Sequence, residues 1–290
     1  MSRSIDCSQP FLSERIPAEI WLQIMECSSL EQDDIANLSL VGRHLRYVIQ
    51  PILFSEIRVT LIQARYLDTY APVRCQHVDY YDRLKKRLEF ATSNHIAYYV
   101  KALTFRVGGE RLDVETQDAI KEEQVLRTVF DELHHFVNLR SFSAQDISLD
   151  GTHFDSLARL EYFNGIHLER CTCSGDLGLT RFKLKSLSLH GKMNGSYGWW
   201  IPLVTSSSVE HLSYDAPALS STETEPEILF PALAVFPHQM RSLRTLRLPA
   251  YAPLFPCFAR ALARCSSVEN LYIDQNGPSR HDILAQVPLL

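Results

Sequence analysis

The stretch Leu-Lys-Ser-Leu-Ser-Leu at residues 184–189 carries leucine at its first, fourth and sixth positions. Alternate residues of a β-strand point to the same face of a sheet. Leu187 and Leu189 therefore share one face, and Ser188 points to the other. We predict that this stretch forms a brief strand with its apolar side in a core.

The same spacing of apolar residues recurs along the chain beyond residue 95. Five further stretches share it: Val100, Leu103 and Phe105; Leu139, Phe142 and Ala144; Val209, Leu212 and Tyr214; Leu243, Leu246 and Leu248; Val268, Leu271 and Ile273. A less regular stretch surrounds Leu157, Leu160 and Phe163. We therefore expect a succession of short strands.

The intervals between these stretches indicate how the strands are connected. The stretches that begin at Leu184, Val209, Leu243 and Val268 are separated by 25, 34 and 25 residues. An interval of 25 residues lies within the range of about 20 to 29 residues found in leucine-rich repeats. The longer interval contains a run of Ser, Thr, Glu and Pro at residues 220–227, which we predict to be a surface insertion.

This part of the chain resembles an irregular leucine-rich-repeat solenoid. A single repeat of that kind cannot bury its apolar edge, so stacked repeats form the core and align their short strands in one parallel sheet. The predicted fold class is therefore α/β. Residues 63–92 and 115–136 have a helical spacing of apolar residues, which predicts a linking helix and one long helix on the convex side.

The N-terminal region has a helical period from its start. Ile16, Ile20 and Ile24 stand four residues apart, and Pro17 and Glu19 suit the first turn of a helix. We predict a first helix here. A unit of three short helices buries little surface by itself, so a partner or the rest of the chain should cover its apolar face.

Two more helices are predicted before residue 54. Asp33 and Asp34 can cap the second helix, which carries apolar residues at every third position up to Val41. The third helix would follow Gly42 and end at Pro51, because proline lacks the backbone donor that a helix needs.

Three motifs in this region resemble the F-box, and they occur in its order. Ile-Pro-Ala-Glu-Ile at residues 16–20 resembles its Leu-Pro-x-Glu-Ile opening, and Asn-Leu-Ser-Leu-Val-Gly-Arg-His-Leu-Arg at residues 37–46 resembles its Leu-x-Leu-Val-Cys-Arg-x-Leu-Arg centre. Pro-Ile-Leu-Phe at residues 51–54 resembles the Pro-x-Leu-Phe exit that is common in fungal members. Ile16 replaces the usual Leu, and Gly42 replaces a usual Cys or Ser. We expect a helix break at Gly42, because glycine destabilises a helix interior.

The resemblance implies three regions: an F-box over residues 13–59, a linking helix region over residues 60–95 and a leucine-rich-repeat-like substrate-recognition domain over residues 96–290. F-box proteins of this kind bind a Skp-family adaptor, and through it a cullin, and they present a protein target for ubiquitination. The chain would be a non-catalytic subunit of a ubiquitin ligase, with an unknown target and no cofactor. An alternative is a leucine-rich-repeat interaction scaffold whose F-box acts outside ubiquitination.

Each of the two main regions predicts a binding surface. The resemblance implies the adaptor-binding residues Ile16, Pro17, Glu19, Ile20, Ile24, Leu38, Val41 and Leu45. The outward-facing strand positions predict the target-binding residues Arg106, Gln145, His190, Asp215, Arg247, Tyr272 and Asp274. Arg247 and Tyr272 are the expected anchors, because Arg and Tyr are enriched at binding hot spots.

Composition argues against several other classes of protein. The net charge of −5 and the pI of 6.1 indicate no basic face for nucleic acid, and the basic run at residues 83–87 suits a solvated helix face. No segment approaches the roughly 20 apolar residues of a membrane span, and no secretory signal is visible. The seven cysteines lack a disulfide framework. We expect a cytoplasmic or nuclear protein without nucleic-acid or membrane partners.

Catalytic motifs are missing from the sequence. Gly191-Lys192 lacks the rest of a phosphate-binding loop, and no Gly-x-Ser-x-Gly occurs. A hydrolase that uses His and Asp side chains of the concave face is a third hypothesis, without a motif to support it.

Some residues that could bind a metal or a partner have a simpler interpretation. Cys171 and Cys173, with His167 before them, have poor spacing for zinc, so we expect buried thiols and no metal. The pair at residues 134–135, both histidines, suits a helix end. The tryptophans at residues 199–200 suit either a recognition hot spot or core packing.

Overall fold

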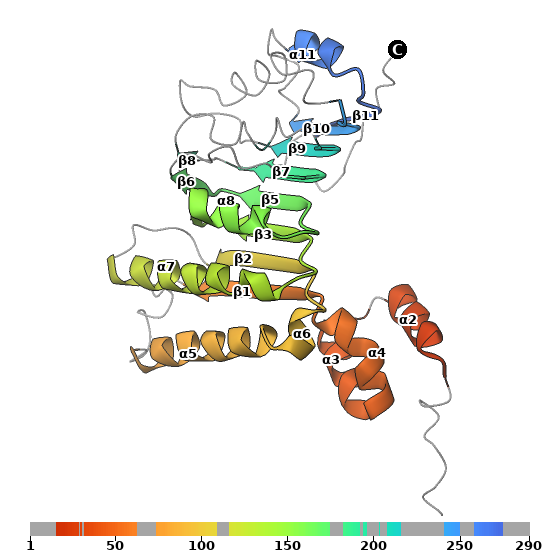
Figure 1. Cartoon of the computed structure of the whole chain (residues 1–290), viewed down its shortest axis with the longest axis vertical. Helices are drawn as coiled ribbons and strands as arrows, with labels where there is room; N and C mark the ends of the chain where they lie inside the picture. Colours follow the sequence, from red (N-terminus) through yellow and green to blue (C-terminus); the bar gives the residue numbers. More distant parts are fainter. Residues whose placement is uncertain are drawn as a thin grey trace, which may run out of the picture.

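The computed structural model describes residues 16–28, 30, 32–62, 74–108, 116–174, 182–191, 194–195, 203, 208–215, 241–249 and 258–274. In this part of the chain it contains eight α-helices, an eight-stranded sheet and a three-stranded sheet. The chain is an α/β protein, as predicted. Figure 1 shows helices at the N-terminal end and a stack of strands that runs from β1 to β11. The predicted insertion at residues 220–227 and the tryptophans at residues 199–200 lie outside the described residues.

Three helices form the N-terminal helical unit: α2 (Ala18–Cys27), α3 (Gln32–Val41) and α4 (Arg43–Leu53). The predicted break between the second and third helices is confirmed, since Gly42 is extended (φ −169°) and separates α3 from α4. The third helix continues past Pro51, where we expected it to end. Its last turn is closed by the N–H of Phe54, which donates to the carbonyl of Gln50 (3.0 Å).

The helical unit has a small core of its own. Met25, Leu45 and Ile49 are buried in it. The partly buried residues around them are Trp21, Leu22, Leu30, Ile35, Leu38, Val48, Ile52 and Leu53. Because this cluster is separate from the core of the sheet, the unit is a packed body attached to one end of the sheet.

The main sheet is entirely parallel, and its strands follow the order of the chain. They are β1 (Glu56–Ile62), β2 (Ala102–Gly108), β3 (Ser141–Gln145), β5 (Gly165–Glu169), β7 (Ser186–His190), β9 (His211–Asp215), β10 (Thr245–Pro249) and β11 (Asn270–Asp274). Each strand thus pairs only with the strands before and after it in this series.

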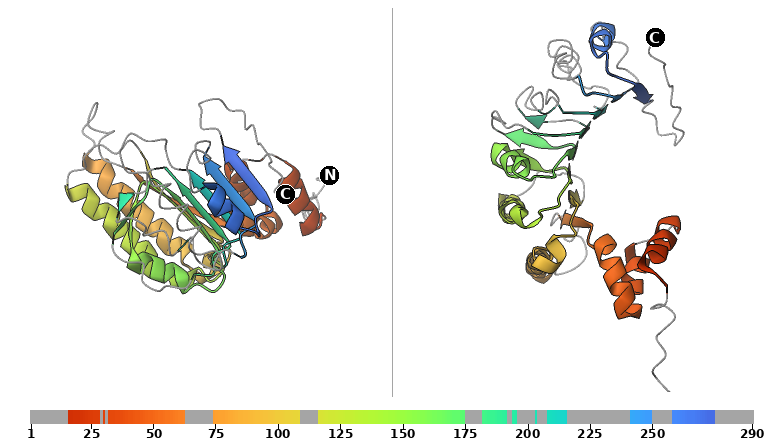
Figure 2. Two further views of the ribbon diagram at one scale, coloured as in Figure 1. Left: turned by 90° about the horizontal axis from the view of Figure 1, so that it is seen from above. Right: turned by 45° about the vertical axis from the view of Figure 1, so that its right-hand side comes forward.

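Helices cover one face of the main sheet. They are α5 (Arg74–Ala91), α6 (Asn94–Ala97), α7 (Thr116–Asp131), the 3-10 turn η2 (Leu133–His135), α8 (Gly151–Ala158) and α11 (Phe258–Arg264). Figure 2 shows that the stack is curved, with these helices on its convex side and the strands lining the concave face. The helices α5 and α7 fall within the two predicted helical segments, of which residues 63–73 lie outside the described part.

A short parallel sheet follows the carboxyl ends of the central strands. It consists of β4 (Ser148–Asp150), β6 (Thr172–Ser174) and β8 (Asn194–Gly195). The residues directly after β3, β5 and β7 have left-handed backbone, and we call them the bend residues: Asp146 (φ 59°), Arg170 (φ 49°) and Gly191 (φ 73°). Their N–H groups donate to the last carbonyl of the next strand, at 2.9, 2.8 and 2.6 Å. These bends direct the chain from the main sheet into the short one.

The predicted apolar stretches build the core between the main sheet and its helices. Leu103 and Phe105 of β2 are fully buried, as are Phe142 and Ala144 of β3. They meet in register, with Leu103 opposite Phe142 and Phe105 opposite Ala144. Of the eighteen apolar residues that define the six regular stretches, Ile273 alone is only partly buried. The prediction of strands with one apolar face is confirmed for all six.

One strand lies away from its expected position. We expected it around Leu157, Leu160 and Phe163, but β5 begins at residue 165 and buries Ile166 and Leu168. Leu157 belongs to α8 and Leu160 to the turn after it. Apolar residues three positions apart on a helical turn have the same spacing as the first two apolar positions of the strand pattern. This similarity explains the error.

The first strand of the sheet was not predicted. In β1, Val59 and Leu61 are buried in the sheet's core, and Ile57 packs against it. The strand starts three residues after the end of α4 and crosses the boundary that we expected between residues 59 and 60. The helical unit is therefore joined to the sheet by the very short segment at residues 54–55.

Candidate functional site

The helical unit exposes large apolar side chains. Ile20 and Ile24 are 44% and 45% exposed, and they share one face of α2 because they are four residues apart. Val41, at the end of α3, is 69% exposed. These three predicted adaptor-binding residues are thus available for contact with a partner.

The other predicted adaptor-binding residues differ in exposure. Pro17 and Glu19 are exposed at the start of α2, whereas Ile16 and Leu38 are half-buried. Leu45 is 2% exposed and lies in the small core with Ile49. Leu45 therefore supports the surface of the unit from inside and does not line it.

Two further exposed apolar residues belong to this unit and were not predicted. Leu40 is 72% exposed and Tyr47 is 74% exposed. Tyr47 lies two residues from both Leu45 and Ile49, on the opposite side of α4. A large apolar side chain on the solvent side of an amphipathic helix is the signal that could have identified it.

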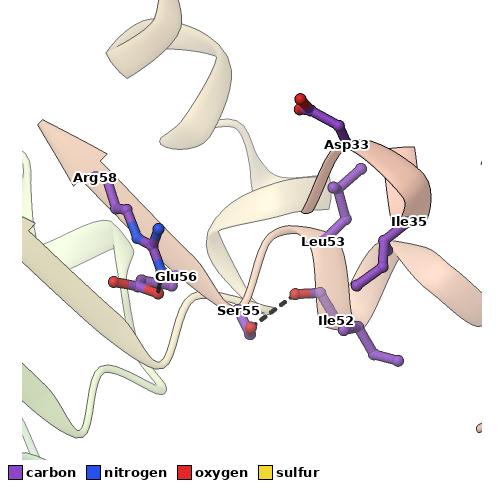
Figure 3. A pocket seen from close by; sticks show the side chains of 7 residues that line it. All are labelled: Asp33, Ile35, Ile52, Leu53, Ser55, Glu56 and Arg58. Carbon is purple, nitrogen blue, oxygen red and sulfur yellow. Dashed lines mark hydrogen bonds and ion pairs between the residues drawn. The ribbon is translucent and has the colours of Figure 1, made fainter. Parts of the chain in front are cut away.

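A pocket of about 480 Å³ lies where the helical unit meets the sheet (Figure 3). Ile35, Ile52 and Leu53 give it an apolar wall, and Glu56 and Arg58 form an ion pair at 2.7 Å on the strand side. The hydrogen bond from Arg58, against the opposing effect of burial, holds the pKa of Glu56 below its usual range. These two charges satisfy each other, and Asp33 adds an exposed carboxylate to the lining, so the pocket presents a mixed polar and apolar surface.

The concave face of the main sheet carries the predicted target-binding residues in two rows. The central row contains Arg58, Thr104, Ser143, His167, Ser188, Ser213, Arg247 and Tyr272, which are successive Cα partners. The carboxyl row contains Thr60, Arg106, Gln145, Glu169, His190, Asp215, Pro249 and Asp274. Apart from Pro249, which is buried, and Asp274, whose side chain the structure does not describe, the residues of both rows alternate with buried core residues and point away from the helices.

The structure places these predicted residues on one face but spreads them along it. Arg106 on β2 and Tyr272 on β11 are six strands apart, or about 29 Å at the usual strand spacing. Arg247 and Tyr272 are direct Cα partners on neighbouring strands. His190 and Asp215 are also partners, and the His190 Nδ1 lies 3.8 Å from the Asp215 Oδ2.

A hollow of about 420 Å³ gathers part of this set near the C-terminal strands. This C-terminal hollow is lined by Ser186, Leu187, Ser188, His190, His211, Leu212, Ser213, Thr245, Arg247 and Tyr272. It brings together three predicted residues, namely His190, Arg247 and Tyr272. The side chain of Asp274 is not among those that the structure describes.

Several residues of the concave face were missed by the sequence reasoning. His211 and Thr245 line the hollow from the first position of their strands. Strand alternation could have identified them, because that position faces the same side as the third and fifth. His167 and Glu169 were missed because β5 was expected too early in the chain.

Three side chains of the concave face have the atomic order of a hydrolytic triad. The Ser188 Oγ lies 2.6 Å from the His190 Nε2, and the His190 Nδ1 lies 3.8 Å from the Asp215 Oδ2. The second distance exceeds a hydrogen bond. The strand β7, which carries Ser188 and His190, is paired along its whole length on both sides, so its backbone N–H groups are occupied and offer no pair of donors for an oxyanion. The arrangement is better suited to hydrogen-bonded recognition than to hydrolysis.

The histidines at the centre of the face are close to each other. The rings of His167 and His190 are 5.1 Å apart. Burial, and then the neighbouring His190, hold the pKa of His167 below its usual range. His167 is therefore neutral at physiological pH and acts as a hydrogen-bonding group.

The cysteines near this face are buried thiols, as expected. The Cys171 Sγ donates to the carbonyls of Ala144 and Glu169, both at 3.4 Å. Burial raises the pKa of Cys173 to about 11, so this thiol stays protonated. Within the described residues, no group of three or more His, Cys, Asp or Glu side chains is placed to hold a metal ion.

Two other sequence-based interpretations are confirmed. Leu84 and Leu88 of α5 are buried, while the basic side chains at residues 83 and 85–87 are exposed. His134 and His135 lie in the 3-10 turn η2 that follows α7, and the Nδ1 of His134 is 2.8 Å from the carbonyl of Asp131, the last residue of α7. Among the helices that the structure describes, none has the length and apolar character needed to cross a bilayer.

Comparison with known proteins adds no relative. No protein-family model matches the chain, and no curated protein matches it. The two surfaces are therefore interpreted from their own residues and from the motifs of the sequence.

Proposed function

We propose that the chain is the substrate-recognition subunit of a Skp-cullin-F-box type ubiquitin ligase. In this proposal the helical unit is an F-box that binds a Skp-family adaptor, and through it a cullin. The curved sheet and its helices form a leucine-rich-repeat domain that binds a protein target. The chain supplies position and no chemistry, because tethering a target beside the transfer machinery makes the reaction effectively intramolecular.

The exposed apolar residues of the helical unit carry the adaptor part of this proposal. Ile20, Ile24, Leu40, Val41 and Tyr47 are each 44% exposed or more, although the unit already has a packed core. Five exposed large apolar side chains on so small a unit favour a protein partner. The F-box motifs of the sequence then suggest which partner it is.

The repeat part of the proposal is supported by the strand order and by the spacing of strands. Neighbouring strands follow the chain order in a parallel sheet, with helices on the convex side. With β5 in its observed place, the stretches that begin at Leu139, Phe163 and Leu184 are separated by 24 and 21 residues. Both intervals fall within the range of leucine-rich repeats.

A cytoplasmic or nuclear location fits the cysteines that the structure describes. Cys27, Cys171, Cys173 and Cys265 are free thiols, and the last three are buried. Free thiols are typical of the reducing compartments in which cullin-based ligases would operate.

The test is to replace the exposed pair Ile20→Asp and Ile24→Asp together and to measure the adaptor that co-purifies with the tagged chain. We expect the adaptor-to-chain ratio to fall at least about tenfold, because two apolar contacts would be lost to charged groups. Both side chains are half-exposed, so the substitution should leave the small core intact.

The matched control is Tyr98→Asp, an apolar residue that is 63% exposed outside the helical unit. It should keep the wild-type ratio of adaptor. Equal adaptor recovery from the double variant would contradict the adaptor proposal, and an adaptor complex that never contains a cullin would favour a scaffold outside ubiquitination.

A further inference from the structure

Several charged side chains at the N-terminal end and the centre of the concave face form ion pairs within the chain. Glu56 and Arg58 form an ion pair at 2.7 Å on β1. At the carboxyl ends of the central strands, Arg170 pairs with Asp146 at 2.7 Å and also with Glu169. Each of these carboxylates has a guanidinium of the same chain beside it, and Arg106 on β2 is a further, exposed cation of this part of the face.

The C-terminal hollow has a different balance. Among the described residues that line it, Arg247 is the one formal cation and none is a carboxylate. The hydroxyl groups in the lining belong to Ser186, Ser188, Ser213, Thr245 and Tyr272. Arg247 is exposed, and its five guanidinium N–H donors allow it to bind a ligand in addition to a partner within the chain. The hollow therefore offers one cation and several hydroxyl groups in one place, with the Asp215 carboxylate nearby, 3.8 Å from the His190 Nδ1.

The side chains of the hollow are held in a fixed arrangement by the sheet. Ser188, Ser213, Arg247 and Tyr272 stand side by side on four neighbouring strands in register. At the usual strand spacing, neighbours in this row are about 5 Å apart. A ligand group above Arg247 is consequently within reach of a hydroxyl on each side.

We propose that the C-terminal hollow binds a carboxylate side chain from an acidic segment of the target protein. This inference rests on the proposed function, because it states the chemistry of that target. Arg247 holds the carboxylate through paired N–H donors. Tyr272 supplies its ring and its hydroxyl beside it, a combination that is frequent at binding hot spots.

The charge of the hollow selects a carboxylate over a phosphate. A phosphorylated side chain carries about −1.5 to −2 charges and is usually held by several Arg side chains. The described lining contains one Arg, and the Asp215 carboxylate lies close by, 3.8 Å from the His190 Nδ1. A dianion would meet more repulsion from Asp215 and less compensation from the cation than a carboxylate does.

The experiment uses the full chain, immobilised with any adaptor that co-purifies, and three pools of labelled 12-residue peptides. Each pool has random flanking positions and one fixed central residue, which is Glu, Gln or phosphoserine. We expect the wild type to retain the Glu pool about tenfold more than the Gln pool, since the two differ by one charge. The preference should weaken between 50 and 500 mM salt, because the site is exposed.

Two variants locate the site. Arg247→Ala should lose the preference for Glu, whereas Arg58→Ala, in the same row at the other end of the sheet, should keep it. Both side chains are exposed, so both variants should unfold at the wild-type temperature. Equal retention of the Glu and Gln pools, or equal losses in the two variants, would overturn the proposal. Stronger retention of the phosphoserine pool would overturn the assignment to a carboxylate.

The outcome is separable from that of the ligase proposal. If the preference for Glu depends on Arg247 but no adaptor co-purifies, the carboxylate-binding site is supported and the ligase function is contradicted. If the adaptor binds but no pool is preferred, the ligase function stands and this inference fails.

Discussion

Gly191 shows how one residue of the chain supports the stacking of its neighbours. Its backbone is left-handed (φ 73°), and its N–H donates to the carbonyl of Asp215 at 2.6 Å. A Cβ atom at this position would lie 2.6 Å from the Cγ of Arg170, the preceding bend residue. Arg170 in turn donates from Nε and Nη2 to the carboxylate of Asp146, at 2.8 and 2.7 Å. The three bend residues therefore depend on one another.

Gly191→Ala should destabilise the chain by about 1–2 kcal/mol, because alanine disfavours the left-handed region and its Cβ would displace Arg170. The measurement is the free energy of unfolding from urea denaturation. Gly165→Ala is the control, since its Cβ would have its nearest neighbour at 3.4 Å and its backbone is not left-handed. If Gly165→Ala lowers the free energy of unfolding as much as Gly191→Ala does, this explanation is wrong.

At the scale of the elements, strands with a strict apolar spacing were predicted well. The stretch at residues 184–189 is regular because Leu184, Leu187 and Leu189 all face the same core, where each is nearly fully buried. The failures have physical causes. Leu157 and Leu160 follow the three-residue spacing of a helical turn, which matches the start of the strand pattern. For β1, the stretch that resembles an F-box exit ends at Phe54, and Ser55 alone separates it from the strand.

The residues that form the two candidate sites could be predicted less well than the strands. Alternation along a strand places a residue such as Arg247 on the concave face, but it does not say which strands create a hollow. Similarly, a motif can identify Leu45 as part of the helical unit, yet only packing against Met25 and Ile49 reveals that it is buried. Contacts between distant parts of the chain decide both questions.

The helix α8 begins with a capping box. The Asp150 Oδ1 accepts from the N–H groups of Thr152 (2.9 Å) and His153 (3.2 Å), and the His153 Nδ1 accepts from the N–H of Asp150 (3.0 Å). Burial alone would raise the pKa of Asp150, but hydrogen bonds from Thr152 and His153 hold it below its usual range. The ionised carboxylate therefore stabilises the folded state.

Asp150→Ala should lower the free energy of unfolding by about 1 kcal/mol at pH 7, the usual effect of losing an N-cap. Because the folded pKa is below the unfolded one, the contribution of Asp150 is present above the unfolded pKa and is lost as the pH falls toward the folded pKa. The difference between variant and wild type should thus narrow below about pH 4. Glu161→Ala, an exposed acidic residue just after α8, is the control and should behave as the wild type.

At the scale of the whole molecule, the two surfaces lie at opposite ends of the sheet. The helical unit joins β1, while Arg247 and Tyr272 stand on the last two strands. The separation across eight strands is about 34 Å. Sites so far apart should act independently.

Arg247→Ala combined with Tyr272→Ala should therefore remove target proteins from a proximity-labelling survey while adaptor recovery stays unchanged. The double variant Ile20→Asp and Ile24→Asp should lose the adaptor and keep the target proteins. A variant that carries all four substitutions should lose both the target proteins and the adaptor. A target survey that is unchanged in the Arg247 and Tyr272 variant would place target recognition on the convex helices or the loops.

The order of strands in the main sheet also determines how the protein would respond to mechanical force. Each strand of the main sheet is bonded within it only to the preceding and the following strand of that sheet. Tension from one terminus would therefore peel the strands away in succession and would not have to break the whole sheet at once. A processive unfolding machine that pulls on one end would then meet a series of small barriers. The protein that we propose to deliver targets for degradation would itself be easy to unfold from one end.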